Sequence, residues 1–214
     1  MARKTLDIEL EKIGKDILKM SNMVCEVIEN SEIALRNRDM KLSMKLINND
    51  DNVDSLYKEI EERCIRTIAL HQPVAKDLRF ITAAMNVASN IERIGDYSVD
   101  TAKIVPYITD EKMNIDEIRT MTGICKEMTR NSVEGFIKND SKKVELVKSK
   151  EEQVDELYKC IFPLLKKVVM EKPERINLAL NLLLVARHLE RTGDHAVNIA
   201  NRAMYAISGK EEYL

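Results

Sequence analysis

Two stretches of the chain repeat each other: residues 87–102 read VASNIERIGDYSVDTA, and residues 185–200 read VARHLERTGDHAVNIA. Eight of the sixteen positions are identical at an offset of 98. A second block repeats in the same way, because VDSLYK at 53–58 matches VDELYK at 154–159 in five of six positions. Two matched blocks at nearly one offset indicate tandem duplication of a unit of about 100 residues.

The composition indicates that both copies are helical. Hydrophobic residues make up 44% of the 214 residues, whereas aromatic residues make up 4%, and there are six Gly and four Pro. Sandwiches and barrels need more strand-forming residues and more turns. Apolar residues recur at steps of three and four, as on one face of a helix. We therefore predict an all-α fold of two tandem three-helix bundles with six long helices, spanning residues 1–107 and 108–214.

Capping residues and prolines place the helix boundaries. The markers are Asp39 as N-cap of the second helix, Pro73 and Pro106 at the ends of the third, and Pro173 before the sixth. The second helix is expected to continue through Cys64. Heptad counting assigns Ile176, Leu180 and Leu183 to the buried row of the sixth helix.

Charge and cysteine content limit the class of protein. The net charge of −2 argues against nucleic acid as a partner. The longest strongly apolar stretch, 178–186, is about half of a membrane span, and the first residues show no secretory signal. We expect a cytoplasmic protein with reduced, packed thiols and no zinc knuckle. The four cysteines are Cys25, Cys64, Cys125 and Cys160.

Acidic residues four positions apart recur in both copies. The sets are Asp50 and Asp54; Glu92, Asp96 and Asp100; Glu151 and Asp155; and Glu190 and Asp194, with Asn198 where the third acid of the first copy would be. Such spacing directs both side chains to one side of a helix. Each apolar row, when continued, reaches one acid of a set, so we expect these carboxylates to be partly desolvated.

Antiparallel hairpins would bring these sets together. The pairs expected at the same height along the two helices of each hairpin are Asp50 with Asp96, Asp54 with Glu92, Glu151 with Asp194, and Asp155 with Glu190. Four unpaired carboxylates at one height repel strongly, and a bound cation removes the repulsion. Oxygen ligands suit iron, manganese, magnesium or calcium, and zinc also fits. Bridging carboxylates would permit a multinuclear cluster.

The neighbouring residues are assigned lesser roles. Arg93 and Arg191 are expected to form ion pairs with the acids. Gly95 and Gly193 have two alternative explanations. Either they allow close helix approach or leave room beside the cluster, or they are simply inherited from the duplication. None of the three histidines is expected to bind metal, although His195 is the best placed of them.

Two other functions remain open at this stage. A metal-free scaffold would carry every acidic pair as solvated surface. A carboxylate-bridged di-metal enzyme normally adds Glu-x-x-His motifs, and no histidine here has Glu three residues before it. We predict that the protein is not an enzyme. Its eleven Met suit cores and adaptable interfaces alike, and we expect a homodimer.

The motifs resemble those of the PhoU family of phosphate-uptake regulators. NIERIGDYSVDTAK and HLERTGDHAVNIAN each follow a D/E-x-x-V-D-x-L-Y-K block by about forty residues. The resemblance implies two three-helix bundles side by side and metal clusters of iron or zinc in the first place, or of magnesium or manganese. The ligands it implies are Asp50, Asp54, Glu92, Asp96, Asp100, Glu151, Asp155, Glu190 and Asp194.

The resemblance also implies a function and partners. It implies a cytoplasmic negative regulator of the phosphate-starvation response, peripheral at the inner face of the membrane through its partners. These partners are the ATPase subunit of a phosphate transporter and a phosphate-sensing membrane histidine kinase. Asn198 departs from the acidic pattern, which puts equal metal occupancy of the two copies in doubt.

Overall fold

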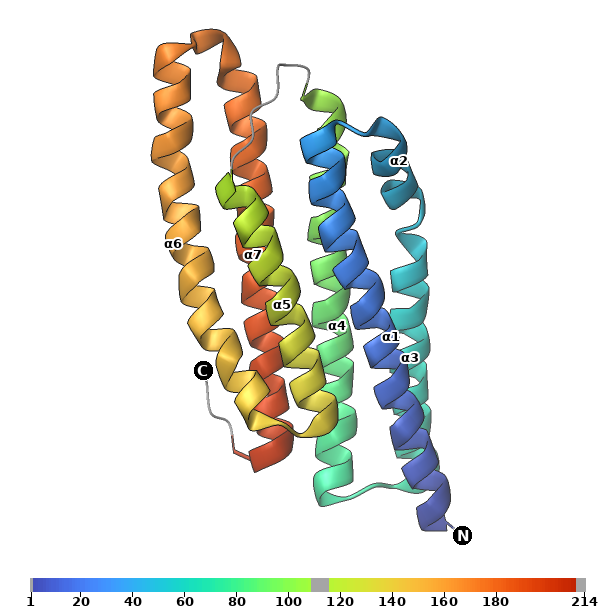
Figure 1. The fold of residues 1–214 in the computed structure, drawn as a ribbon. Helices are drawn as coiled ribbons and strands as arrows, with labels where there is room; N and C mark the ends of the chain where they lie inside the picture. Colours follow the sequence, from blue (N-terminus) through green and yellow to red (C-terminus); the bar gives the residue numbers. More distant parts are fainter. Residues whose placement is uncertain (1, 109–115, 211–214) are drawn as a thin grey trace.

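The computed structural model describes residues 2–108 and 116–210, and within these ranges the chain is helical and has no strand. The all-α prediction is confirmed. The helices are α1 (Ala2–Asn37), α2 (Met40–Asn48), α3 (Asp51–His71), α4 (Ala75–Ile104), α5 (Asp116–Lys138), α6 (Ser141–Glu171) and α7 (Ile176–Ser208) (Figure 1). Two 3₁₀ turns, η1 (Val105–Tyr107) and η2 (Pro173–Arg175), follow α4 and precede α7.

The duplication is visible in the turns after α1 and α5. Arg38 and Asn139 adopt left-handed backbone angles, with φ of 54° and 53°. The next residue in each copy is an aspartate that caps the following helix. The side chain of Asp39 accepts hydrogen bonds from two backbone amides of α2, and that of Asp140 accepts two from α6. The predicted cap at Asp39 is therefore confirmed, and the same device starts α6.

The prediction of one continuous second helix was wrong. The chain breaks between α2 and α3, where residues 48–52 read NNDDN. Short polar side chains compete with helical backbone hydrogen bonds, and five in succession weaken the helix at this point. The corresponding part of the second copy, SKEEQ at 149–153, contains no such run, and α6 continues through it.

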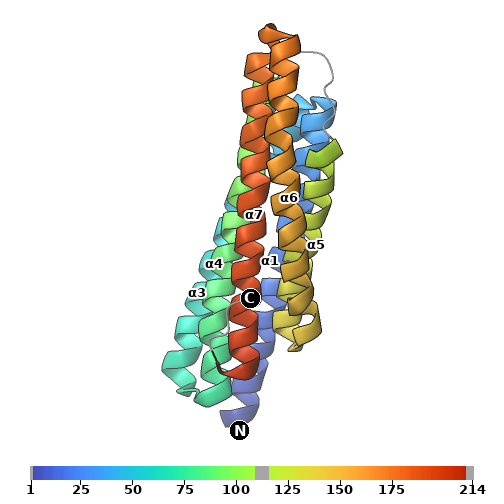
Figure 2. The same ribbon diagram turned by 90° about the vertical axis from the view of Figure 1, so that its left-hand side faces the viewer.

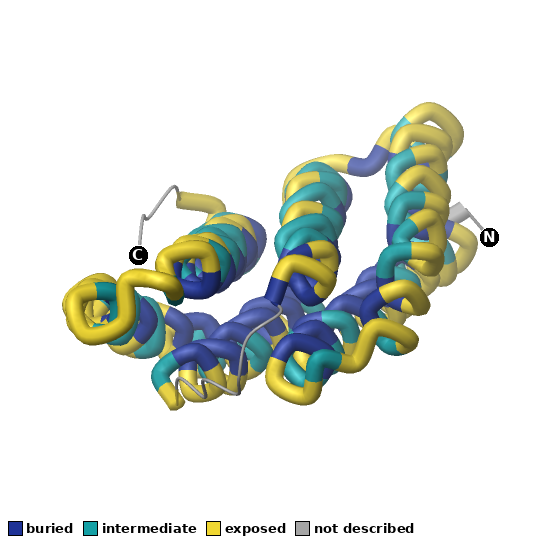
Figure 3. Tube along the Cα trace, turned by 90° about the horizontal axis from the view of Figure 1, so that it is seen from above, coloured by how far each residue is buried: buried dark blue, intermediate teal, exposed yellow. Residues whose placement is uncertain are grey.

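The two copies pack against each other in antiparallel orientation. The α3–α4 turn and the α6–α7 turn lie at opposite ends of the molecule (Figure 1). Helices α3, α4, α7 and α6 are neighbours in this order, and α1 and α5 pack side by side against them (Figure 3). One continuous hydrophobic cluster, from Ile13 to Ala206, spans both copies. The stacked rings of Phe80 in α4 and Phe136 in α5, 5.0 Å apart, join the copies within it.

The buried row predicted for the sixth helix was wrong at two of its three positions. Ile176 and Leu180 are exposed, whereas Leu183 packs partly buried against the core. The residues that α7 buries near its start are Leu178, Ala179 and Leu182. The first turns of α7 are apolar on nearly every side, so periodicity alone cannot select the buried face. The neighbouring helices α4, α5 and α6 determine which side of α7 is buried, because they pack against that side.

Three of the four cysteines are buried as expected, but Cys160 is exposed, and all four are free. Cys160 follows Lys159 on the solvent side of α6, one residue before the buried Ile161. The prediction of a packed thiol was therefore wrong at this position. Among the described helices, none combines the length and the apolar character needed to cross a bilayer.

Substitution Arg38→Gly should stabilise the protein by about 1 kcal/mol, because a left-handed φ strains every residue with a Cβ atom. The measurement is the free energy of unfolding from urea denaturation. The control is Lys19→Gly at an exposed site inside α1, which should cost about 1 kcal/mol. Loss of stability in both variants would contradict the strain at position 38.

Candidate metal centre

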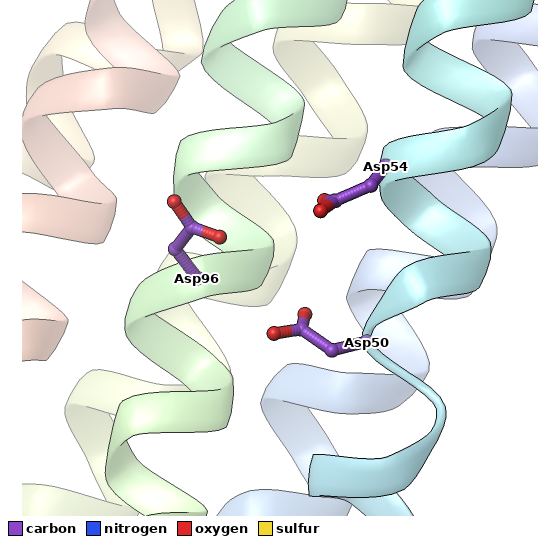
Figure 4. A group of neighbouring side chains, drawn as sticks. All are labelled: Asp50, Asp54 and Asp96. Carbon is purple, nitrogen blue, oxygen red and sulfur yellow. The ribbon is translucent and has the colours of Figure 1, made fainter.

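The first acidic set forms a compact group between α3 and α4. Asp50, which directly precedes α3, and Asp54 in the first turn of α3 point towards Asp96 of α4 (Figure 4). One carboxylate oxygen from each residue lies within 4.8 Å of the others, and all three side chains are half-buried. Oxygen atoms at this spacing can share one hard cation after small side-chain adjustments.

Local structure places each of these acids. Asp50 is the residue before α3, at the break between α2 and α3, and its side chain makes no capping hydrogen bond. Asp54 lies one turn further along α3, and the antiparallel α4 brings Asp96 opposite. Beneath them Gly95 faces Val24 and Val53, where an added Cβ would lie 3.5 Å from each valine. That is ordinary contact, so the space at Gly95 would admit alanine, and close helix approach does not require glycine there.

Burial and mutual repulsion make this group costly in its ionised form. Desolvation raises the pKa of Asp50, and repulsion by Asp54 and Asp96 raises it further. Desolvation is also the largest cause of the raised pKa of Asp96 and of Glu92. Each of the three carboxyls is therefore harder to ionise here than in water.

Basic residues compensate only part of this charge. The Arg93 guanidinium lies 3.2 Å from an oxygen of Asp96 and 3.5 Å from one of Glu92. Lys103 donates to Asp100 over 2.8 Å at the more exposed edge of the group. The ion-pair role predicted for Arg93 is thus confirmed. Asp100 stands apart from the three gathered acids and faces the lysine instead.

The second set lies between α6 and α7 in a more open arrangement. Desolvation raises the pKa of Glu151, followed by repulsion from Asp155 and Asp194. The pKa of Glu190 is likewise raised by desolvation, then by Asp194. The hairpin therefore brings the four predicted acids together. Within the described residues, however, only the first set places three ligand atoms within 4.8 Å of one another.

One carboxylate oxygen in the second set is buried without a hydrogen-bond partner. Glu190 Oε2 accepts no hydrogen bond, although guanidinium nitrogens of Arg187 and Arg191 lie 3.7 and 3.6 Å away. These separations are too long for hydrogen bonds. Arg191 instead bonds Asp194 over 3.0 Å, which confirms its predicted ion-pair role. An orphaned carboxylate oxygen beside further carboxylates fits a cation-binding group.

Comparison with known proteins places both repeats of the chain in one family. The family model described as "PhoU domain" matches residues 17–105 and 118–203, one match in each copy. The chain belongs to the PhoU family. A phosphate-specific transport system accessory protein PhoU homolog of Clostridium acetobutylicum is 34% identical over 99% of this chain and 98% of its own length. A homolog of the same name from Aquifex aeolicus is 38% identical over 94% of this chain and 92% of its own.

Solved PhoU structures share the whole fold. The phosphate transport system regulatory protein PhoU from Streptococcus pneumoniae has a TM-score of 0.88 and 26% identity, covering 98% of this chain and all of its own. PhoU from Pseudomonas aeruginosa has a TM-score of 0.90 and 29% identity, covering 95% and 99%. The relatives are named accessory or regulatory proteins and not enzymes, in agreement with the prediction.

A polar contact between the two PhoU repeats escaped the sequence analysis. His195 Nδ1 lies 2.8 Å from Asn90 Oδ1, and His188 Nδ1 lies 3.4 Å from Thr101 Oγ1. The ring of Tyr97 lies between these histidines, 5.7 and 6.0 Å from them. At the offset of 98, His188 corresponds to Asn90 and His195 to Tyr97. The positions that differ between the repeats therefore contact each other where α4 packs against α7, and these differences were the signal that the sequence offered.

Substitution Asp50→Asn should stabilise the metal-free protein at pH 7 and weaken its pH dependence. A carboxyl with a raised pKa binds more protons in the folded than in the unfolded chain, so its contribution falls as the pH rises from about 3.8 through the folded-state pKa. Thermal unfolding from pH 4 to 8 with chelator measures this, and about 2–4 °C corresponds to 1 kcal/mol. Glu59→Gln, at an exposed site of α3, should change little. A less stable Asp50→Asn protein at pH 7 would argue against repulsion.

Proposed function

We propose that this protein is a metal-binding negative regulator of phosphate uptake and of the phosphate-starvation response. It acts in the cytoplasm, at the inner face of the membrane, and couples the ATPase subunit of a phosphate transporter to a phosphate-sensing histidine kinase. The observation that carries the proposal is the match of both repeats to the PhoU domain. Relatives that align over nearly the full chain are named accessory proteins of the phosphate-specific transport system.

The gathered carboxylates support the metal-binding part of the proposal. Asp50, Asp54 and Asp96 would hold an ion in the first repeat, with Glu92 beside them and Asp100 at the more exposed edge. Glu190 Oε2 offers an unused oxygen in the second. A bound cation would neutralise the repelling charges and tie α3 to α4, or α6 to α7. Iron or zinc are the first candidates, and magnesium or manganese the next.

Rigidity of the two hairpins is the property that such an ion would regulate. Glu92 and Asp96 lie on α4, Glu190 and Asp194 lie on α7, and these two helices pack against each other. Cross-linking each hairpin would therefore stiffen a continuous layer of four helices. Partner proteins that dock onto this layer would meet a surface whose shape and charge depend on the metal.

The partner proposal is tested by capture under phosphate-replete conditions. Tagged full-length protein should retain both the transporter ATPase subunit and the sensor kinase from detergent-solubilised membranes. A copy with Arg38→Gly, which leaves the layer of α3, α4, α7 and α6 unchanged, serves as the control for folding and should capture both. Absence of both partners with well-folded protein would refute the regulatory role.

The metal proposal is tested by elemental analysis and by titration calorimetry. Paired substitution Asp54→Asn and Asp96→Asn should reduce bound metal in the first repeat by about tenfold or more, because two of three gathered ligands lose their charge. The matched control is Asp51→Asn with Glu59→Gln, two exposed acids of the same helix. Unchanged metal content in the ligand variant would favour a metal-free scaffold instead.

A further inference from the structure

Helix α2 is the shortest α-helix in the described part of the chain. Of its nine residues, Ser43 and Leu46 are the buried ones. Both of its ends adjoin interruptions of the helical chain, at Arg38 with a φ of 54° and at residues 48–52. Isolated helices shorter than about 12–15 residues are marginal in water, so α2 depends on its neighbours for its order. One such support is the hydrogen bond from Ser43 Oγ to the carbonyl of Ala102, at 2.8 Å.

The packing of α2 against these neighbours is incomplete. A cavity of about 290 Å³, partly open to solvent, lies between α1, α2 and the start of α3. Leu42 and Leu46 of α2 line this cavity together with Met23 and Val27 of α1. These side chains border the cavity instead of being close-packed all round, so α2 is stabilised less than a helix in a dense core. Asp50 lies in the wall of the same cavity.

The backbone of Asp50 joins α2 to α3. Its amide donates to the carbonyl of Ile47 in α2 over 3.5 Å, and its carbonyl accepts from the amide of Val53 in α3 over 3.0 Å. Its side chain does not cap α3 and points towards Asp54 and Asp96 (Figure 4). The position of one of the three gathered ligand atoms therefore depends on the end of α2.

The charge state of the acidic group acts on this joint. Without a cation, the carboxylates of Asp54 and Asp96 repel that of Asp50, which pushes the end of α2 away from α4. A cation held by the three carboxylates would reverse this force and link the end of α2 to α4 through Asp96. Opening of α2 would then displace Asp50 and cost the ion one of its gathered ligands.

The second repeat has a continuous helix in place of this joint. At the offset of 101, α2 corresponds to residues 141–149 and Asp50 to Glu151. Both lie within α6, which runs unbroken to the α6–α7 turn (Figure 2). The first turns of α6 bury Val144 and Val147. An ion at Glu151 would therefore bind a helix that is already formed on both sides of its ligand.

We propose that cation binding by Asp50, Asp54 and Asp96 orders α2, so that α2 is the element of the first repeat that responds to the metal. The inference rests on the metal-binding part of the proposed function and adds the element that the ion controls. Met40 and Met44 of α2 are exposed. The surface that these adaptable side chains form would then depend on the bound ion.

Hydrogen exchange of the full-length protein, followed by mass spectrometry, provides the test. With chelator, residues 40–48 should exchange faster than residues 141–149, because α2 opens more easily. Fe²⁺ without oxygen, Zn²⁺, Mn²⁺ and Mg²⁺ are then added in turn, each at about ten times the dissociation constant measured by calorimetry. Exchange at 40–48 should slow about threefold to tenfold, where tenfold is the limit reached if opening of α2 expels the ion. Exchange at 141–149 should change little.

Matched variants locate the origin of the effect. Asp54→Asn with Asp96→Asn removes the charge of two of the three gathered ligands and should abolish the slowing at 40–48. Asp155→Asn with Asp194→Asn makes the same changes at the corresponding positions of the second repeat. This second variant should show the same slowing at 40–48 as the wild type.

Several results would overturn the proposal. They are exchange at 40–48 no faster than at 141–149 in chelator, a bound cation that leaves 40–48 unchanged, equal slowing of both segments, and slowing that persists in the Asp54→Asn, Asp96→Asn variant. Calorimetry separates this failure from that of the proposed function. If the wild type binds none of the four cations, the metal-binding part of the proposed function fails and the inference fails with it. If a cation binds and α2 does not respond, the proposed function stands and the inference alone fails.

Discussion

The antiparallel contact between α4 and α7 is the interaction on which the other features depend. Each of these helices completes its own three-helix bundle and also packs against the other, so the two repeats share one core. Small side chains make this crowding feasible, since α4 buries Ala84 and Ala88, and α7 buries Ala196 and Ala200. With neighbours on most sides, each helix keeps only one flank near the surface. The acidic motifs occupy that flank in both repeats.

The negative charges on this flank destabilise the folded protein, because the carboxylates are partly desolvated and repel one another. Raised pKa values at Asp50, Glu92 and Glu151 show that desolvation and mutual repulsion exceed the compensation by nearby arginine and lysine. A protein selected for stability alone would replace such a group by apolar or paired residues. Retention of the acids in two copies is accounted for by the cation-binding role proposed above, in which the ion supplies the missing charge.

The two repeats have kept one architecture and diverged in their surfaces. In the first, the break before Asp50 and the approach of Asp96 gather three ligand atoms. In the second, α6 is continuous, the acids are more open, and Leu180 and Leu184 replace polar residues. The repeats therefore differ in what they present to solvent: a compact carboxylate group in the first, and exposed leucines at 180 and 184 in the second.

The sequence alone determined the duplication, the helical class and the pairing of acids, because each depends on spacing along one helix or on a hairpin of known sense. Only the tertiary structure decided the break before Asp50, the outward side of α7 and the contact of Asn90 with His195. Periodicity selects no face where the first turns of a helix are apolar on nearly every side, and a repeat offset does not reveal which differing residues meet between the repeats. Packing against neighbouring helices settles both, since burial is a property of the assembled core.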